Sequence, residues 1–202
     1  MPPKTRFSRE VIIDVAFNIV RWNGWEALSA RAVAEELKSS TMPVYFHFKS
    51  MENLEEEIVK RALTLQLEYQ DRSYTGDRLL DLGVGYVTFA NEESHLFRGI
   101  NERKHSHLLA RHGQNIFDLH WQALAGDPRF ERFTDDQRRR ILMAMWFFVH
   151  GLAHLSISMP LDEYDDYDLP RILGNTTAIF FKGLNIVLDE ELERLRRQVK
   201  SG

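Results

Sequence analysis

Residues 37–54 read LKSSTMPVYFHFKSMENL, and Pro43 is the third residue of the aromatic and β-branched run TMPVYFHF. A proline cannot donate a hydrogen bond to a neighbouring strand, but its missing N–H costs nothing in the first turn of a helix. The stretch therefore predicts a short helix over Thr41 to His47, with Ser40 as its N-cap, and Val44 and Phe48 facing inward. The side chains expected to point outward are those of Thr41, Met42, Tyr45 and His47.

Helical patterns lie on both sides of this segment. Apolar residues from about Ser8 to Asn23 recur at helical spacing, and Gly24 supplies a stop. Ser29 is a suitable N-cap for a second helix that is too short to be stable alone, and Ser50 can cap a fourth. Two short helices joined by a tight turn, the second with polar and aromatic residues at its front, form a helix-turn-helix whose second helix enters the DNA major groove.

The composition limits the classes of function. The 202 residues include no cysteine, which excludes disulfides and thiolate chemistry and is typical of a reducing cytoplasm. The basic N-terminus lacks the apolar core of a signal peptide, and no apolar run approaches the roughly 20 residues of a membrane span. Lys and Arg outnumber Asp and Glu in residues 1–49 although the whole chain has a formal charge of −4, which favours a local docking surface over indiscriminate nucleic-acid coating.

The rest of the chain predicts a second, larger helical unit. The segments 77–93 and 94–102 each indicate one helix, and 104–126 indicates a single longer helix. A capping box and a capping aspartate mark the starts of two long final helices, which have more apolar surface than one core needs. We therefore predict an all-α homodimer with two-fold symmetry and two domains, 1–50 and 51–202. The two long helices are expected to run from Thr134 with Gln137 to about Met159, and from Asp168 onward.

An ordered set of residues runs through the segment RFSREVIIDVAFNIVRWNGWEALSARAVAEELKSSTMPVYFHFKSMENL. Its opening helix ends at Gly24, and the later features are Ser29-x-Arg31-x-Val33-Ala34, Tyr45-x-His47-Phe48 and Ser50-x-Glu52-x-Leu54. In this combination the segment resembles the DNA-binding region of TetR-type transcriptional regulators. The resemblance implies a helix-turn-helix domain over residues 1–50 that binds an operator in double-stranded DNA.

The resemblance also implies roles for individual residues. Tyr45 and His47 match the pair that touches the DNA backbone, with Lys49 close enough to assist, because hydroxyl, imidazole and ammonium groups donate to phosphate oxygens. Base discrimination would fall to Thr41 and to the apolar Met42 and Pro43, which could contact a thymine methyl. The complete predicted DNA-binding set is Ser29, Arg31, Ser40, Thr41, Met42, Pro43, Tyr45, His47 and Lys49.

Three positions depart from the family's pattern. Lys38 stands where a turn glycine is usual, Ser39 where a buried aliphatic residue is usual, and Met51 where a phosphate-binding lysine is frequent. They keep open an alternative function, a helical ligand-binding or oligomerisation module that has lost DNA binding.

The region 51–202 is similar to the family's effector-binding and dimerisation domain. That similarity implies a small-molecule effector that changes the spacing of the DNA-binding heads, as in a repressor released by its ligand. Aromatic residues in this region suggest a largely apolar or aromatic effector, although aromatic stripes are more often plain core. The candidate effector-binding residues are Phe97, Phe117, Trp121, Trp146, Phe147 and His150.

Several histidines raise a metal hypothesis. His150 and His154 lie four residues apart and could bind zinc if another helix supplied a third ligand. No HExxH carboxylate accompanies them, and Ser156 and Ser158 lack the glycine pattern of a hydrolase nucleophile. We therefore expect no metal, no cofactor, no catalytic residues and no enzymatic activity, in a cytoplasmic protein without a membrane segment. The other histidines weighed for a metal site are His105, His107, His112 and His120.

Overall fold

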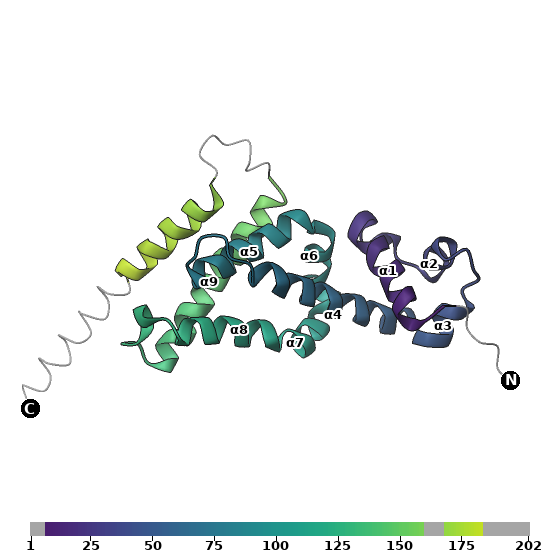
Figure 1. The fold of residues 1–202 in the computed structure, drawn as a ribbon, viewed down its shortest axis with the longest axis horizontal. Helices are drawn as coiled ribbons and strands as arrows, with labels where there is room; N and C mark the ends of the chain where they lie inside the picture. Colours follow the sequence, from purple (N-terminus) through teal and green to yellow (C-terminus); the bar gives the residue numbers. More distant parts are fainter. Residues whose placement is uncertain (1–6, 160–167, 184–202) are drawn as a thin grey trace, which may run out of the picture.

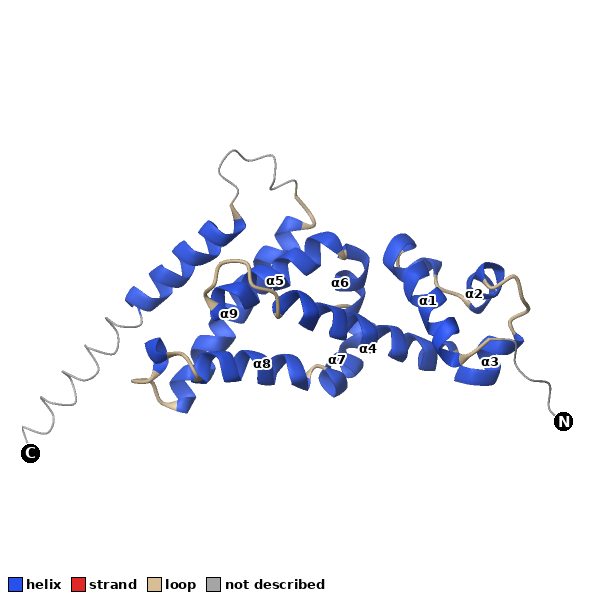
Figure 2. Ribbon diagram, viewed as in Figure 1, coloured by secondary structure: helices blue, strands red, loops and turns tan. Residues whose placement is uncertain are grey.

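The computed structural model describes residues 7–159 and 168–183, and all the regular structure in these ranges is helical (Figures 1 and 2). The all-α prediction is thereby confirmed. Within the same ranges no helix combines the length and the apolar character needed to cross a lipid bilayer. The helices are α1 (Arg9–Asn23), α2 (Ala30–Glu36), α3 (Met42–Phe48), α4 (Met51–Gln70), α5 (Arg78–Glu92), α6 (Ser94–Ile100), α7 (Ser106–His112), α8 (Gln114–Ala125) and α9 (Asp135–Ser156), with short 3-10 turns η1 (Trp25–Ala27), η2 (Arg103–His105) and η3 (Pro128–Phe130).

The molecule is elongated, with α1, α2 and α3 gathered at one end (Figure 1). We call this end the head, and we call the remainder from α5 onward the body. Helix α4 joins them, since it packs against α1 and α3 in the head and against α5, α6 and α7 in the body. A single buried apolar cluster continues along α4 from Phe48 in the head to Phe97 in the body. Any movement of α4 is therefore shared by both parts.

Serine caps set the starts of α2 and α4. Ser29 Oγ accepts from the Ala32 N–H at 3.0 Å, and Ser50 Oγ accepts from the Asn53 N–H at 3.3 Å, so both predicted caps are confirmed. The prediction of Ser40 as N-cap is wrong, because Thr41 occupies the N-cap position and α3 starts one residue later than expected. The Thr41 carbonyl accepts the first helical hydrogen bonds there, and the Thr41 side chain makes no cap hydrogen bond.

The turn between α2 and α3 closes without the expected glycine. Lys38 adopts a left-handed backbone, with φ of 49°. The Ser39 N–H donates to the Ala34 carbonyl at 2.9 Å, and the Lys38 N–H donates to the Glu35 carbonyl at 3.0 Å. These two bonds are the Schellman pattern that usually ends a helix at glycine. The helix-turn-helix geometry is thus retained with a lysine in the strained position.

The body contains one helix boundary that the hydrophobic periodicity did not predict. The predicted single helix over 104–126 is wrong, since it divides at Gly113 into α7 and α8. A side chain at this glycine would place its Cβ 2.6 Å from the Leu109 carbonyl oxygen, so the chain can turn this tightly only with glycine. The capping box of Thr134 and Gln137 is confirmed, and α9 ends at Ser156 rather than near Met159.

The helical segment 169–183 covers part of the body. Its start is capped as predicted, because Asp168 Oδ1 accepts from the Arg171 N–H at 3.1 Å. Leu173 is buried next to Gly83 of α5, and the Phe181 ring lies 4.8 Å from that of Phe130. The predicted extension of this helix beyond residue 183 lies outside the described residues.

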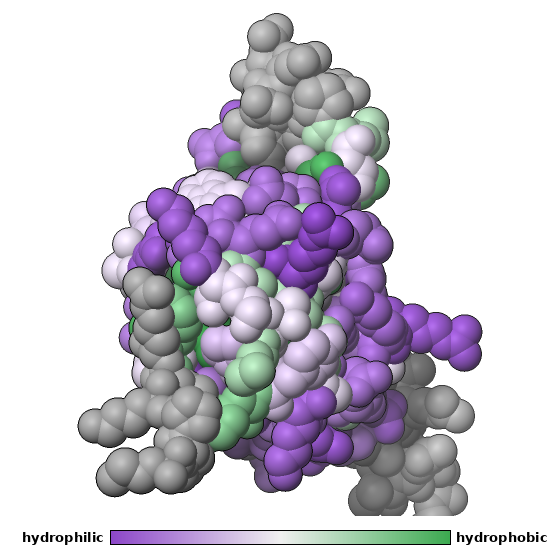
Figure 3. Space-filling model, turned by 90° about the vertical axis from the view of Figure 1, so that its right-hand side faces the viewer, coloured by the Kyte–Doolittle hydropathy of each residue, from purple (hydrophilic) through white to green (hydrophobic). Residues whose placement is uncertain are grey.

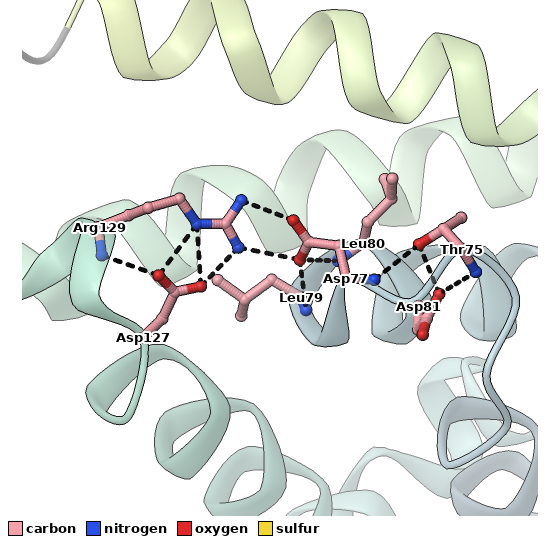
Figure 4. A network of polar contacts seen from close by, with 7 residues as sticks. All are labelled: Thr75, Asp77, Leu79, Leu80, Asp81, Asp127 and Arg129. Atoms are coloured by element: carbon pink, nitrogen blue, oxygen red, sulfur yellow. Dashed lines mark hydrogen bonds and ion pairs between the residues drawn. The ribbon is translucent and has the colours of Figure 1, made fainter.

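A polar network fastens η3 to the start of α5 (Figure 4). Asp77 caps α5 and also accepts from Arg129, which is paired with Asp127 as well. The guanidinium lowers the pKa of both aspartates, so they stay ionised. Asp81, one turn into the helix, accepts from the N–H and hydroxyl groups of Thr75. The network thereby holds the end of α5 that carries Leu79 and Leu82, two residues of the cavity described below.

Candidate functional site

Helix α3 has an inner and an outer side, as the sequence predicted. Val44 and Phe48 are buried at 0% and 3% exposure, whereas Met42 and Tyr45 are 69% and 48% exposed. The neighbouring Phe46 is also exposed, at 61%. The front of α3 therefore offers a phenol hydroxyl and two apolar side chains to a partner outside the chain.

Two predicted contact residues are placed differently from the expectation. Pro43 is buried with its neighbour Val44, so its ring cannot contact a thymine methyl. His47 Nε2 lies 3.0 Å from the Phe7 carbonyl oxygen, and since a carbonyl only accepts, the imidazole N–H donates to it. This N–H fastens the segment before α1 to α3 and is not directed at a phosphate.

The remaining predicted DNA-binding residues lie on the surface of the head. Arg31 is exposed and pairs with Glu35 at 3.1 Å, an arrangement that costs little to break. Lys49 is exposed at the end of α3, and Thr41 is partly exposed at its start. Seen from the head end, the surface is mostly hydrophilic with smaller apolar areas (Figure 3). Ser29 and Ser40 are exposed, and their hydroxyl oxygens accept main-chain N–H groups of α2 and α3.

The body contains a hollow of about 240 Å³ between α4, α5, α7, α8 and α9. A smaller space of about 50 Å³ adjoins it and shares Tyr86, His120, Leu142 and Trp146. We call the two together the effector cavity, because Phe117 and Trp146 of the predicted effector-binding residues line it. Its other lining residues are Gln66, Gln70, Leu79, Leu82, Gly83, Asn101, Leu109, Gly113, Ile116, Phe117, Met143, Met145 and Val149.

A chain of hydrogen bonds forms the polar end of the effector cavity. Gln70 Nε2 donates to the Leu82 carbonyl at 3.2 Å and lies 2.8 Å from His120 Nε2. Because the amide nitrogen donates, His120 Nε2 accepts and the ring proton is on Nδ1. Burial, with a smaller effect of the Arg78 charge, lowers the pKa of His120 to about 4. The imidazole is therefore neutral at physiological pH.

A second polar pair lies at the side of the cavity. The Tyr86 hydroxyl is 2.7 Å from His150 Nδ1, and burial raises the pKa of this tyrosine. The phenol consequently keeps its proton and donates to the histidine. Burial also lowers the pKa of His150, with a further contribution from His154. The Trp146 indole stacks on the His150 ring with centroids 5.0 Å apart, so this part of the wall is ordered by aromatic packing.

The structure separates the six predicted effector residues. Phe117 and Trp146 line the cavity, and His150 supports it through Tyr86. Phe97 is fully buried against Tyr86 and Phe89 and belongs to the core, not to the cavity lining. Two others lie outside the lining: Trp121 stacks on Phe117, and Phe147 is 61% exposed.

Sequence reasoning missed the polar lining residues Gln66 and Gln70. Their spacing of four on α4, beside the buried Leu63 and Tyr69, places amides on an otherwise apolar helix face. A buried polar residue within an apolar stripe is the signal that could have identified them. His120 was considered only as a metal ligand.

The histidines do not assemble a metal site within the described residues, where no group of three metal-ligating side chains occurs. They bond instead to separate partners. His105 donates through Nδ1 to the Gly99 carbonyl, and its Nε2 lies 3.3 Å from Glu55 Oε2. His112 Nε2 lies 2.8 Å from Glu56 Oε1. These contacts attach η2 and α7 to the first turns of α4.

Comparisons with known proteins agree with this geometry. A family model described as bacterial regulatory proteins of the tetR family matches residues 12–58. A second, described as the C-terminal domain of tetracyclin repressor-like proteins, matches residues 79–171. The chain belongs to the TetR family of transcriptional regulators. Its helix-turn-helix is accordingly the DNA-binding part of a TetR-family regulator.

Solved structures share the TetR fold at low sequence identity. A protein of unknown function from Rhodococcus sp. RHA1 has a TM-score of 0.67 at 18% identity, covering 91% of this chain and 98% of its own. A Rhodococcus sp. protein described as a TetR-family transcriptional regulator has a TM-score of 0.64 at 20% identity, covering 86% and 98%. The multidrug binding protein EbrR, complexed with imidazole, has a TM-score of 0.58 at 18% identity, covering 85% and 95%. The sequence matches no curated protein.

Proposed function

We propose that this TetR-family regulator is a cytoplasmic repressor that binds its operator as a homodimer and is released by a small, largely apolar or aromatic molecule. The observation that carries the proposal is the continuity from α3 through α4 to the effector cavity. The recognition helix packs on α4 through Val44 and Phe48, and α4 itself lines the cavity with Gln66 and Gln70. A ligand that moves α4 would also move the recognition helix.

For DNA contact, the exposed groups of α3 divide by chemistry. The Tyr45 hydroxyl and the Lys49 ammonium suit phosphate oxygens, which position the head without reading sequence. Met42 and Thr41 lie at the start of α3, where a methyl-bearing side chain suits a thymine methyl. Arg31 on α2 can exchange its exposed partner Glu35 for a phosphate.

Exposed apolar residues support the homodimer. Met143 and Leu155 on α9 are 41% and 51% exposed, and Ile179 in the segment 169–183 is 71% exposed. A second copy that covers these side chains would pair the final helices of both protomers. The two heads would then address major-groove half-sites about 34–36 Å apart, or a multiple of that distance.

The contacts of α7 suggest how a ligand would act on the head. Leu109 of α7 lines the cavity, while His112 of the same helix bonds to Glu56 on α4. Glu56 and Glu55 lie only a few residues after α3 ends. A ligand that favours a different placement of α7 would shift the population toward a head spacing that no longer fits the operator.

Titration of the full chain against genomic fragments at two salt concentrations tests the DNA-binding part. We expect a sequence preference that persists as added salt weakens affinity. Tyr45→Phe and Lys49→Ala should weaken binding to all sequences alike, whereas Thr41→Ala should change the preference. If the chain binds no fragment, or if all three variants keep the wild-type affinity and preference, the docking surface proposed on α3 is wrong.

A further inference from the structure

The effector cavity has largely apolar walls, polar groups of Tyr86 and Asn101 at its side, and one polar end. Among the described residues that line it, none has a carboxylate, ammonium or guanidinium side chain. The polar end consists of Gln66, Gln70 and His120, which lie on α4 and α8 and face the same space. The hydrogen bonds within this group determine which ligand atom could join it.

The orientation of Gln70 is fixed by its partners. The Leu82 carbonyl can only accept, so the amide nitrogen of Gln70 faces it, at 3.2 Å. The second N–H of the same amide is directed to His120 Nε2 at 2.8 Å. The amide oxygen of Gln70 then accepts from Gln66 Nε2 at 3.4 Å. All the hydrogen-bonding groups of the Gln70 amide are engaged in this way.

The same chain of bonds leaves Gln66 with an unused acceptor. Because Gln66 Nε2 must face Gln70, its amide oxygen points elsewhere, and no group among the described residues donates to it. The residue is only 3% exposed, and it lines the hollow of about 240 Å³. A ligand that fills this hollow must donate a hydrogen bond to the oxygen or leave it unsatisfied, at a cost of about 1–3 kcal/mol.

The size of the cavity limits the ligand further. An apolar cavity of about 150 Å³ takes up benzene. The hollow lined by Gln66 measures about 240 Å³, which suits one or two rings. An ion would lose its hydration there without meeting an opposite charge, at a cost of several kcal/mol.

We propose that the effector is an uncharged molecule of one or two rings that donates a hydrogen bond, as a hydroxyl group does, to the amide oxygen of Gln66. This inference rests on the proposed function, because it assumes that the effector cavity is where the effector binds. Gln66 is then the residue that determines specificity for the polar end of the ligand, while Phe117 and Trp146 contact its rings.

Three probes of matched ring size test the inference by equilibrium dialysis at neutral pH, without DNA. They are 2-naphthol, 2-methylnaphthalene, in which a methyl group replaces the hydroxyl, and the anion 2-naphthoate. We expect 2-naphthol to bind about tenfold more tightly than 2-methylnaphthalene, since only the hydroxyl satisfies the buried oxygen. The anion should bind roughly 100-fold more weakly than 2-naphthol, because no cation faces it.

The variant Gln66→Leu assigns the preference to one side chain. It should bind 2-methylnaphthalene at least as tightly as the wild type does. The variant should bind 2-naphthol with nearly the affinity that it has for 2-methylnaphthalene, so the tenfold preference disappears. The control Gln122→Leu, an exposed glutamine on α8, should keep the full preference. If Gln66→Leu does not fold cooperatively, Gln66→Met serves in its place with the same expected result.

The outcomes separate this inference from the proposed function. If 2-methylnaphthalene binds as tightly as 2-naphthol, if 2-naphthoate binds equally well, or if the preference survives in the Gln66 variants, the inference is wrong while the cavity remains an effector site. If none of the three probes binds the wild type, both the inference and the proposal of an aromatic effector fail.

Discussion

The head and the body place their candidate sites in opposite ways. The residues proposed to contact DNA lie between residues 29 and 49, on two consecutive short helices and the turn that joins them. The effector cavity instead combines side chains from Gln66 on α4 to Val149 on α9. The first site depends on local helix boundaries, and the second depends on how distant helices pack.

This difference between local and long-range construction determines how each site responds to substitution or to a bound molecule. The backs of α2 and α3 are held by a few buried side chains, so their outer faces tolerate substitution with little effect on stability. The cavity is part of the body's packing, and any ligand within it acts on several helices together. The proposed function separates the surface that would read DNA from the interior that would respond to a ligand, so the contacts between head and body are expected to contribute most to stability.

The largest expected effect lies at that contact. Arg21 of α1 donates through Nε to Glu93 Oε2 at 2.7 Å and through Nη2 to the other oxygen, and the Glu93 side chain is only 3% exposed. Arg21→Ala leaves this carboxylate buried without its cation and should lower the free energy of unfolding by about 3 kcal/mol. Urea unfolding measures the change.

The control for this experiment is the exposed pair of Arg140 and Asp136, whose side chains are 81% and 69% exposed. Arg140→Ala should cost no more than about 0.5 kcal/mol. Equal losses in the two variants would show that the link between head and body is no more important than a surface ion pair.

A second substitution disturbs the same contact between head and body through steric overlap. Trp25 of η1 donates to the His95 carbonyl at 3.0 Å, and a Cβ at Gly99 of α6 would lie 1.6 Å from the indole Nε1. Gly99→Ala should therefore displace the indole and lower the free energy of unfolding by roughly 1–3 kcal/mol. The near-ultraviolet circular dichroism of the tryptophans should change as well.

Gly151→Ala is the matched control, because a Cβ at this position in α9 meets no atom within 4 Å. There the added methyl should stabilise the helix by about 0.5–1 kcal/mol. If Gly99→Ala behaves like Gly151→Ala, the close approach of α6 to Trp25 does not constrain the head.

The two regions also differ in how far their sequence could predict them. Ser29 and Ser50 as caps, and the inward positions of Val44 and Phe48, were predicted correctly because each depends on residues within about one helical turn. The hydrogen bond of His47 to the Phe7 carbonyl was not predicted, because the two residues are 40 apart in sequence. Even in the head, the local sequence pattern did not predict contacts between residues far apart in the chain.

In the body the same kind of pattern was ambiguous. Phe97 and Phe147 carry the same side chain and were both predicted as effector-binding residues, yet one is fully buried and the other is 61% exposed. Periodicity states that a residue lies on an apolar face, but not whether that face meets another helix, a cavity or a second protomer. The polar residues Gln66 and His120 mark the cavity better, because a polar group is buried only at a specific place.

The neutral state of His120 yields a prediction specific to the cavity. Its pKa of about 4 in the folded protein lies below the ordinary value of 6.5. Between these values the unfolded chain binds a proton that the folded protein does not, so the free energy of unfolding falls as the pH is lowered from 6.5 toward 4. The slope from this group is at most about 1.4 kcal/mol per pH unit.

Urea unfolding at several pH values compares the wild type with His120→Gln, which keeps an acceptor for Gln70 but does not titrate. This variant should have a shallower dependence on pH, by up to about 1.4 kcal/mol per unit. His107→Gln, an exposed histidine on α7, should retain the wild-type slope. An unchanged slope in His120→Gln would mean that the cavity does not hold this imidazole neutral.

The smallest expected change in stability lies in the head, at the turn between α2 and α3. Lys38 holds a φ of 49° in the turn before the recognition helix, a conformation that costs a side-chain-bearing residue about 1–2 kcal/mol. Lys38→Gly removes this cost but adds freedom to the unfolded chain, so a net gain of about 0.5–1 kcal/mol is expected. Ser39→Gly is the control and should destabilise, because positive φ among the described non-glycine residues occurs only at Lys38 and Lys49. Since the Schellman bonds already give the turn its geometry, Lys38→Gly should stabilise the head but should not raise operator affinity. The loss of one exposed positive charge should lower that affinity slightly. A variant that is less stable than the wild type would mean that the lysine makes a contact worth more than its strain, and that this turn is not the simple local feature that distinguishes the head from the body.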